Sequence, residues 1–272
     1  MWPFGNSRTM PPTRASATLA CLTACLVGCP GATAQVILVD SLQPGDHVSR
    51  PLKIGRRTIS LPAGDWQLIV KTERNPSTDA TRQMPTLVRL QFQELLDGRL
   101  NRMLELAASS YSARSDWQDE PCKYKGDSYW IEDRGTGTHD QFCLRVGFRS
   151  GMVDGARGDT FLAWARELKA KSIGYAPEMP AVTVTRYTTY DFLSMSISFD
   201  PAVSGIQRSK DSTRQFNDWN PTTIAQHPDH KGFYEALVSW TPVFAAAVQR
   251  AFDGDETLSP KDFAGPAFAK VR

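Results

Sequence analysis

A strict alternation of apolar and polar side chains in the last third of the chain constrains the fold most. Four apolar residues (Leu193, Met195, Ile197, Phe199) alternate there with three serines (Ser194, Ser196, Ser198). A period of two places successive side chains on opposite faces of a strand. The alternation therefore predicts a half-buried strand of an antiparallel sheet, whose serine face either meets solvent or lines a polar cleft.

Other segments are also typical of strands. Val36–Lys71 contains short alternating runs separated by turns, and Gln141–Phe148 and Ala181–Tyr187 are rich in apolar and β-branched residues. Asn75–Pro85 is polar and bounded by prolines, which predicts a loop. The leucines of Thr86–Ala108 would also fit a helix, but apolar and polar residues alternate over residues 88–93. Asp97–Gly98 at the midpoint favours the type I′ turn of a hairpin, and a glycine inside a helix would cost about 1 kcal/mol.

Two helices complete the expected architecture. Residues 159–172 carry one apolar stripe, and residues 228–253 carry a longer one between Pro228 at the first helical position and Gly254 at the end. Pro242 should bend this second helix. We expect one α+β domain over residues 35–253, strand-rich from 35 to 74, followed by a loose tail over 254–272.

The first 34 residues have the form of an export signal. Arg8 and Arg14 give a positive start, Ala15–Val27 is an apolar run of thirteen residues, and Ala32–Ala34 offers a small-x-small cleavage site. The run is shorter than the roughly 20 residues of a membrane-spanning helix. We therefore expect a removed leader and a periplasmic or secreted protein without a transmembrane span in the mature chain.

A competing cleavage site overlaps this signal. Leu26–Cys29 resembles a lipobox, in which Cys29 would carry a lipid and anchor the protein to the cell envelope. Pro30 and the short spacer that follows favour cleavage before Gln35 instead. Both mature N-termini remain open, and so does a start of the chain at Met10.

The cysteines predict a disulfide-bonded protein, and the charges do not favour a nucleic-acid-binding protein. Only Cys122 and Cys143 remain after the leader is removed, and an isolated pair in an exported protein predicts a disulfide. The two leader arginines account for the formal net charge of +2. A mature chain of net charge zero gives no electrostatic reason to expect nucleic acid as a partner.

The chain contains one local group of residues of the types that catalyse proton transfer. The chain has no nucleophile elbow, phosphate-binding glycine loop or H-E-x-x-H motif, and no cofactor is expected. His227, Asp229 and His230 cluster at the start of the long helix, where they fit a helix cap or, alternatively, a general base with an orienting carboxylate. Without a third or fourth ligand we expect no metal.

A second group lies just before this helix. Asn217 and Trp219 combine an aromatic ring with an amide, as sugar-binding surfaces do. The alternative is a buried tryptophan that fixes an irregular loop, and the abundance of turn-forming residues around it favours this interpretation.

Landmarks over Cys122–Asp253, about half of the chain, resemble those of uncharacterised exported proteins of proteobacteria. The resemblance rests on five short segments (Gln141–Cys143, Trp164–Ala165, Val182–Val184, Phe199–Pro201, Asp218–Pro221). The last segment departs slightly from the N-W-x-P-like pattern. The resemblance implies no activity, ligand or site.

Two functions are compatible with the sequence. The absence of catalytic motifs and the neutral charge favour a non-catalytic binding or interaction protein of the periplasm or cell envelope. The alternative is a periplasmic hydrolase with residues scattered along the sequence and His227 or His230 as the base. A cleft in which histidines and carboxylates converge would favour the hydrolase.

Overall fold

The computed structural model describes residues 36–74, 85–114, 121–123, 125–126, 128–150, 159–176, 178–207, 209 and 217–268, with backbone only for 149–150 and 159–164. The chain divides into two compact units, Met1–Thr33 and Ala34–Arg272, and every described residue belongs to the second. The expected leader with Cys29, and residues 75–84 of the expected loop, lie outside the described residues.

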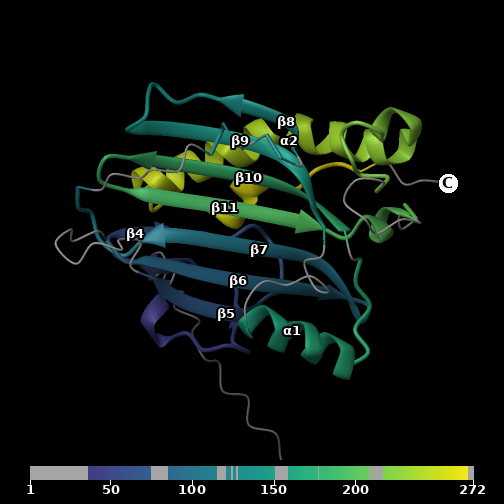
Figure 1. Cartoon of the computed structure of the whole chain (residues 1–272). Helices are drawn as coiled ribbons and strands as arrows, with labels where there is room; N and C mark the ends of the chain where they lie inside the picture. Colours follow the sequence, from purple (N-terminus) through teal and green to yellow (C-terminus); the bar gives the residue numbers. More distant parts are fainter. Residues whose placement is uncertain are drawn as a thin grey trace, which may run out of the picture. The chain divides into compact units, whose positions relative to one another are not determined.

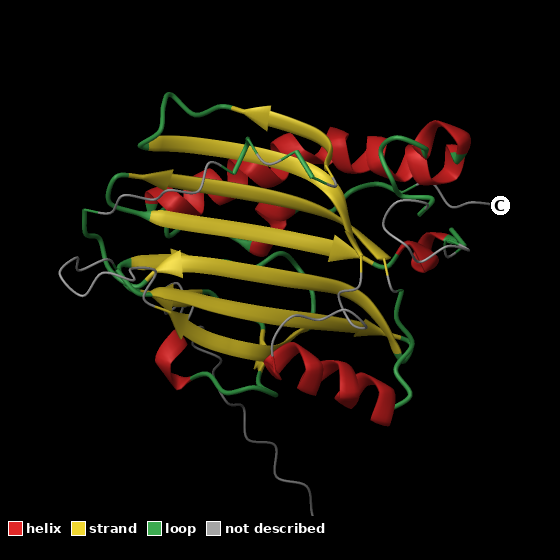
Figure 2. Ribbon diagram, in the orientation of Figure 1, coloured by secondary structure: helices red, strands yellow, loops and turns green. Residues whose placement is uncertain are grey.

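The second unit is an α+β domain built on an antiparallel sheet of eight strands (Figures 1 and 2). In spatial order the strands are β2 (His47–Val48), β5 (Trp66–Arg74), β6 (Leu87–Leu96), β7 (Arg99–Ser109), β11 (Phe192–Phe199), β10 (Glu178–Thr188), β9 (Asp140–Ser150) and β8 (Ser128–Asp133). A smaller sheet has the order β1 (Ile37–Leu38), β3 (Leu52–Ile54) and β4 (Arg57–Ile59).

Two α-helices and four short 3-10 turns accompany the sheets. The helices are α1 (Asp159–Ala170) and α2 (Pro228–Asp253), and the turns are η1 (Val39–Ser41), η2 (Pro201–Ser204), η3 (Ile224–Gln226) and η4 (Pro260–Phe263). Pro228 starts α2, and Gly254 ends it with a φ of 80°. No helix in the described part of the chain is long and apolar enough to cross a membrane.

The turn of the predicted hairpin is confirmed. β6 and β7 pair antiparallel, and Asp97 and Gly98 connect them with φ values of 50° and 72°. Positive φ at both central residues defines the type I′ turn, whose twist matches that of the flanking strands. The hairpin continues the sheet from β5 to β11, so the strand-rich N-terminal part belongs to the same domain.

The two faces of the large sheet have different chemistry. α2 lies behind the sheet in Figure 1 and packs on β9, β10 and β11. Apolar side chains of these strands face it, and they form the main core with Phe233, Leu237, Phe244 and Val248 of the helix. α1 lies near β5 and packs on the opposite face with a smaller apolar cluster that includes Met103 and Leu168.

The expected loose tail requires a correction. Residues 255–268 pack on the domain: Leu258 and Phe263 are buried, and the ring of Phe268 stacks on that of Phe233 at 4.0 Å. Ser259 and Asp262 form a capping box that starts η4. These few apolar residues lack a helical or strand period, so the sequence pattern did not indicate that they are buried.

Candidate functional site

The start of α2 brings the two sequence-predicted groups together. His227 precedes the helix as its N-cap residue without a capping hydrogen bond, Asp229 lies in the first turn, and the rings of His227 and His230 are 5.6 Å apart. His227 Nε2 lies 3.5 Å from Oδ1 of Asp218. The site therefore contains two imidazoles and the carboxylate of Asp218, whose approach to His227 no sequence motif indicated.

Trp219 is buried directly against His230 of this site. Its side chain is 0% exposed and lies against His230, with ring centres 4.4 Å apart, and against Tyr234. Asn217 Oδ1 accepts a hydrogen bond from the Trp219 backbone N–H at 2.9 Å, and the Tyr234 hydroxyl donates to the Trp219 carbonyl at 3.1 Å. These contacts fix an irregular loop on the helix, and no exposed ring face is left for a sugar to stack on.

His230 is a buried group of this site with a ring nitrogen that lacks a hydrogen-bond partner among the described residues. Its side chain is 9% exposed, and within the described residues its Nε2 atom has no hydrogen-bond partner. Burial lowers the pKa of His230 below its ordinary value of 6.5, and the nearby charge of Asp218 opposes this shift. A neutral imidazole with a free ring nitrogen can accept a proton or a hydrogen bond.

Among the residues that the structure describes, no group of three or more histidine, cysteine, aspartate or glutamate side chains is placed to bind a metal ion. Two shallow hollows are lined by other residues: one includes Arg50, Ser60 and Trp66, and the other includes Pro242 and Arg250. Neither of these two hollows contains a histidine.

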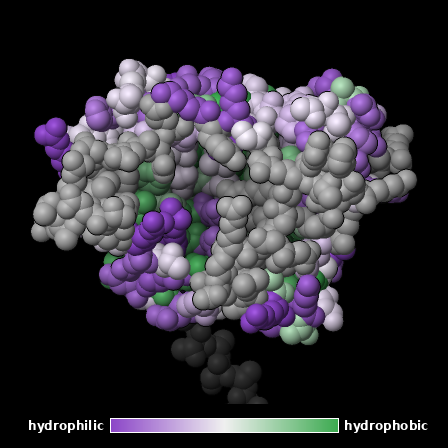
Figure 3. Space-filling view, viewed as in Figure 1, coloured by the Kyte–Doolittle hydropathy of each residue, from purple (hydrophilic) through white to green (hydrophobic). Residues whose placement is uncertain are grey.

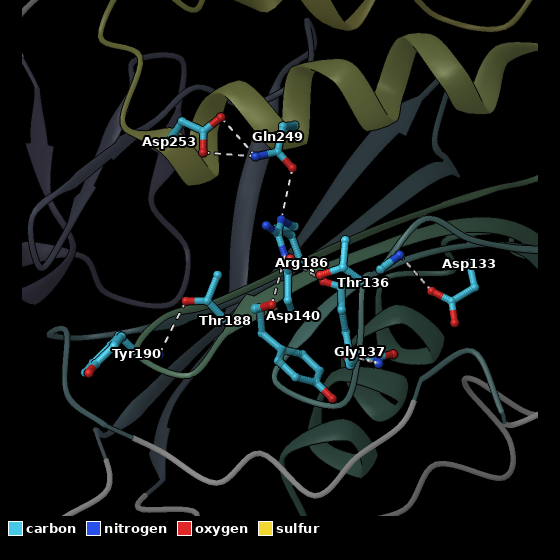
Figure 4. Close-up of polar contacts among 12 residues, drawn as sticks. Asp133, Thr136, Gly137, Asp140, Arg186, Thr188, Tyr190, Gln249 and Asp253 are labelled. Carbon is cyan, nitrogen blue, oxygen red and sulfur yellow. Dashed lines mark hydrogen bonds and ion pairs between the residues drawn. The ribbon is translucent and has the colours of Figure 1, made fainter.

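A second polar group surrounds Arg186 on β10, near the C-terminal end of α2 (Figure 4). Arg186 donates to Asp140, to the backbone carbonyls of Gln141 and Tyr187, and to Gln249 Oε1 of α2 at 3.1 Å. Hydrogen bonding from Thr136 and the nearby Arg186 lower the pKa of Asp140. The guanidinium of Arg186 is hydrogen-bonded to protein groups on β9, β10 and α2. These residues therefore link the sheet to α2.

Arg57 and Asp191 form a further buried ion pair that the sequence did not indicate. Arg57 Nη2 lies 2.8 Å from Asp191 Oδ1, in an ion pair without hydrogen-bond alignment, and the two side chains are 2% and 8% exposed. Arg57 also donates to the Phe252 carbonyl at 3.1 Å. The pair spans 134 positions of the sequence, so only the fold brings its members together.

The serine face of β11 lies on the side of the sheet opposite α2. Thr183 Oγ1 lies 2.8 Å from Ser196 Oγ, and Thr185 Oγ1 lies 3.0 Å from Ser194 Oγ, so β10 and β11 form cross-strand hydroxyl pairs. Figure 3 views this face, on which both hydrophilic and hydrophobic side chains are visible. The hydroxyl pairs, together with Ser198, are called the hydroxyl floor below.

The predicted disulfide borders the hydroxyl floor. Cys122 and Cys143 are joined, with Cα atoms 5.4 Å apart. Cys143 lies opposite Thr185 in the register of β9 and β10, on the same face as the hydroxyls. The bond therefore fixes the Cys122 segment to the sheet beside this floor.

Comparison with known proteins gives no relative for this chain. No family model, curated protein or solved structure matches it. The structure by itself thus defines the class of the protein, an α+β domain with a large antiparallel sheet and a long C-terminal helix.

Proposed function

We propose that this chain is an exported bacterial protein of the periplasm or cell envelope that binds a partner or small ligand without catalysis. The observation that carries the proposal is the hydroxyl floor. In this floor Ser196 and Ser198 are buried, at 4% and 2% exposed, whereas Thr183 and Ser194 are half-exposed. The cross-strand hydroxyl pairs of Thr183 and Ser194 on central strands offer polar groups in fixed positions, as a binding surface needs.

Export is the second part of the proposal. It rests on the leader in residues 1–34 and is compatible with the Cys122–Cys143 bond, since disulfides persist in oxidising compartments. Mass spectrometry of the mature N-terminus tests it. Gln35 as the first residue supports soluble export, a diacylated Cys29 supports a lipid anchor, and an uncleaved chain contradicts both.

Site-specific photo-crosslinking in intact cells tests the use of the hydroxyl floor. A photo-reactive residue at position 194 should give an adduct, because Ser194 is half-buried in the floor. The matched control is position 239 on the exposed side of α2, where we expect none. Native mass spectrometry of the purified protein distinguishes a small ligand from a protein partner. An absence of adducts at position 194, or equal adducts at both positions, would contradict the proposal.

The alternative function is a hydrolase that uses the start of α2. The specific observation in its favour is the neutral, unpartnered His230 beside the His227–Asp218 pair. Ester, phosphodiester and peptide substrates should show no turnover if the protein is non-catalytic. Turnover that the combined His227→Ala and His230→Ala variant abolishes would replace the binding proposal with the hydrolase.

A further inference from the structure

His230 lies where a positive charge is disfavoured. It belongs to the first turn of α2, at the end of the helix where the helix dipole is positive. Its side chain is 9% exposed, and within the described part of the chain its Nε2 atom has no hydrogen-bond partner. A second proton on the ring would place a positive charge here and leave the Nε2–H group without an acceptor. The packing around His230 therefore suits the neutral imidazole.

The titratable groups that face His230 come from the loop before α2 and from the start of α2 itself. Asp218 and Asp229 favour the protonated ring, whereas His227, with its ring centre 5.6 Å away, opposes it. Asp218 Oδ1 also lies 3.5 Å from Nε2 of His227, so the two histidines share the attraction of this carboxylate. Burial outweighs these charges and lowers the pKa of His230 from its ordinary value of 6.5. The ring is therefore neutral at neutral pH and becomes charged only in acid.

Trp219 connects His230 to the loop. The indole ring is fully buried against His230, with ring centres 4.4 Å apart, and it also meets the rings of Phe233 and Tyr234 edge-on. The Tyr234 hydroxyl donates to the Trp219 carbonyl at 3.1 Å. Departure of the His230 ring would open one side of the indole to water. It would thereby remove part of the apolar burial that holds Trp219 on α2.

The remainder of the loop is held together by its own hydrogen bonds. The carbonyl of Asn220 accepts from the backbone N–H groups of Thr223 and Ile224, at 3.0 and 2.9 Å. The side chain of Asn220 accepts two further hydrogen bonds from Thr222. These bonds do not depend on α2. Residues 217–226 can therefore leave the helix as one unit.

We propose that residues 217–226 form a pH-sensitive closure on the start of α2. At neutral pH the neutral ring of His230 packs on Trp219, and the closure is in place. In acid the ring takes a proton from solvent and turns out towards water, and the loop detaches while the sheet and the rest of α2 stay folded. When the pH rises, the ring returns the proton to solvent and the loop closes again. The closure thus covers or uncovers the rings of Trp219 and Phe233 according to pH.

A thiol in the loop reports the opening. Cys122 and Cys143 are joined to each other, so Ile224→Cys gives the mature chain one free thiol, at a position that is 4% exposed. Its reaction with dithiodipyridine, corrected for the rate of free cysteine at the same pH, should be about tenfold faster at about pH 5 than at about pH 7.5. The matched control is Ala247→Cys, 2% exposed in α2, which should stay protected at both pH values.

Two variants assign the pH dependence to His230. His230→Leu cannot bind a proton, so the Ile224→Cys thiol should then react equally slowly at both pH values. Asp218→Asn, at a half-buried position, removes a charge that favours the protonated ring and should move the opening to lower pH. His139→Leu, at an exposed site, should leave the opening unchanged.

The wild type, without a cysteine in the loop, gives a separate measurement. Its tryptophan emission should shift to longer wavelength in acid and return when the pH is restored. Slow reaction of Ile224→Cys at both pH values, as expected if a protonated His230 stays on Trp219, overturns the proposal. A pH dependence that His230→Leu retains also overturns it. So does a loss of protection of Ala247→Cys in acid, which would show that the whole domain unfolds.

Discussion

The two ends of α2 differ in how completely the charged and polar side chains around them are paired. Near the C-terminal end, Arg57, Arg186 and Arg250 each pair with a carboxylate, two of them at 2.7–2.8 Å. Near the N-terminal end, His227 lies 3.5 Å from Asp218, and the described residues offer His230 Nε2 no partner. A network whose charged groups are paired with one another stabilises the fold, whereas a network with an unpaired ring nitrogen can still accept a proton or a hydrogen bond from a ligand.

The largest loss of stability is expected when the most buried ion pair near the C-terminal end of α2, Arg57–Asp191, is removed. Asp191→Ala leaves the guanidinium of Arg57, which is 2% exposed, without a counter-charge. We expect a loss of roughly 3–5 kcal/mol in the free energy of unfolding, measured in urea. Arg56→Ala, which removes the exposed partner of the same carboxylate, should cost less than about 1 kcal/mol. Equal losses would contradict a structural role for the buried pair.

The stability of the structure around the N-terminal end of α2 should depend on hydrogen bonds between uncharged groups instead of ion pairs. Tyr234→Phe removes the donor to the Trp219 carbonyl and leaves a buried acceptor unpaired. We expect a loss of roughly 1–3 kcal/mol that high salt does not alter. Tyr190→Phe at an exposed position is the control and should leave urea unfolding unchanged. A salt-dependent loss in Tyr234→Phe would show that charge also holds this end.

We expect the stability of the fold to depend on pH through His230. The folded state lowers its pKa, so the unfolded state binds the proton first as the pH falls through 6.5. Stability should therefore decrease as the pH falls below the ordinary histidine value of 6.5. His230→Leu should flatten this slope, whereas His139→Leu, at an exposed site, should keep it. An unchanged slope in His230→Leu would rule out His230 as its source.

The smallest effect is expected from the exposed part of the C-terminal network. Hydrogen bonds from Thr257 and Arg250 lower the pKa of Asp255 from 3.8 to about 2. Its contribution is present above pH 3.8 and is lost as the pH falls towards 2. Arg250→Gln should reduce this contribution slightly, and less so in high salt. Arg134→Gln, which removes a similar pair with Glu132 away from α2, is the comparison variant.

The sequence predicted the elements more fully than it predicted their contacts. The alternation at Ser194–Ser198, the turn at Asp97–Gly98 and the ends of α2 depend on local periodicity and on residues with special backbone conformations. The β11 alternation also indicated which face is polar. The sequence could not indicate what covers each face, because this depends on the register between distant strands.

The candidate site was predicted in two halves. The helix period placed His227, Asp229 and His230 together, but nothing local showed that Trp219 would lie against His230 or that Asp218 would approach His227. The Arg57–Asp191 pair was missed for the same reason. Neither residue belongs to a motif, and a buried charge is recognised only when its counter-charge is known.

The packing of the last residues has a consequence for the order of folding. Ser60 donates to the carbonyl of Leu258 at 2.6 Å, and Arg57 donates to that of Phe252, so β4 and its neighbours are fastened by contacts nearly 200 positions away. Contacts of such long range form late, because the intervening chain must close a large loop first. The contacts of Arg57 and Ser60 with the end of α2 and the segment after it therefore cannot form before residues 252–258 have been synthesised.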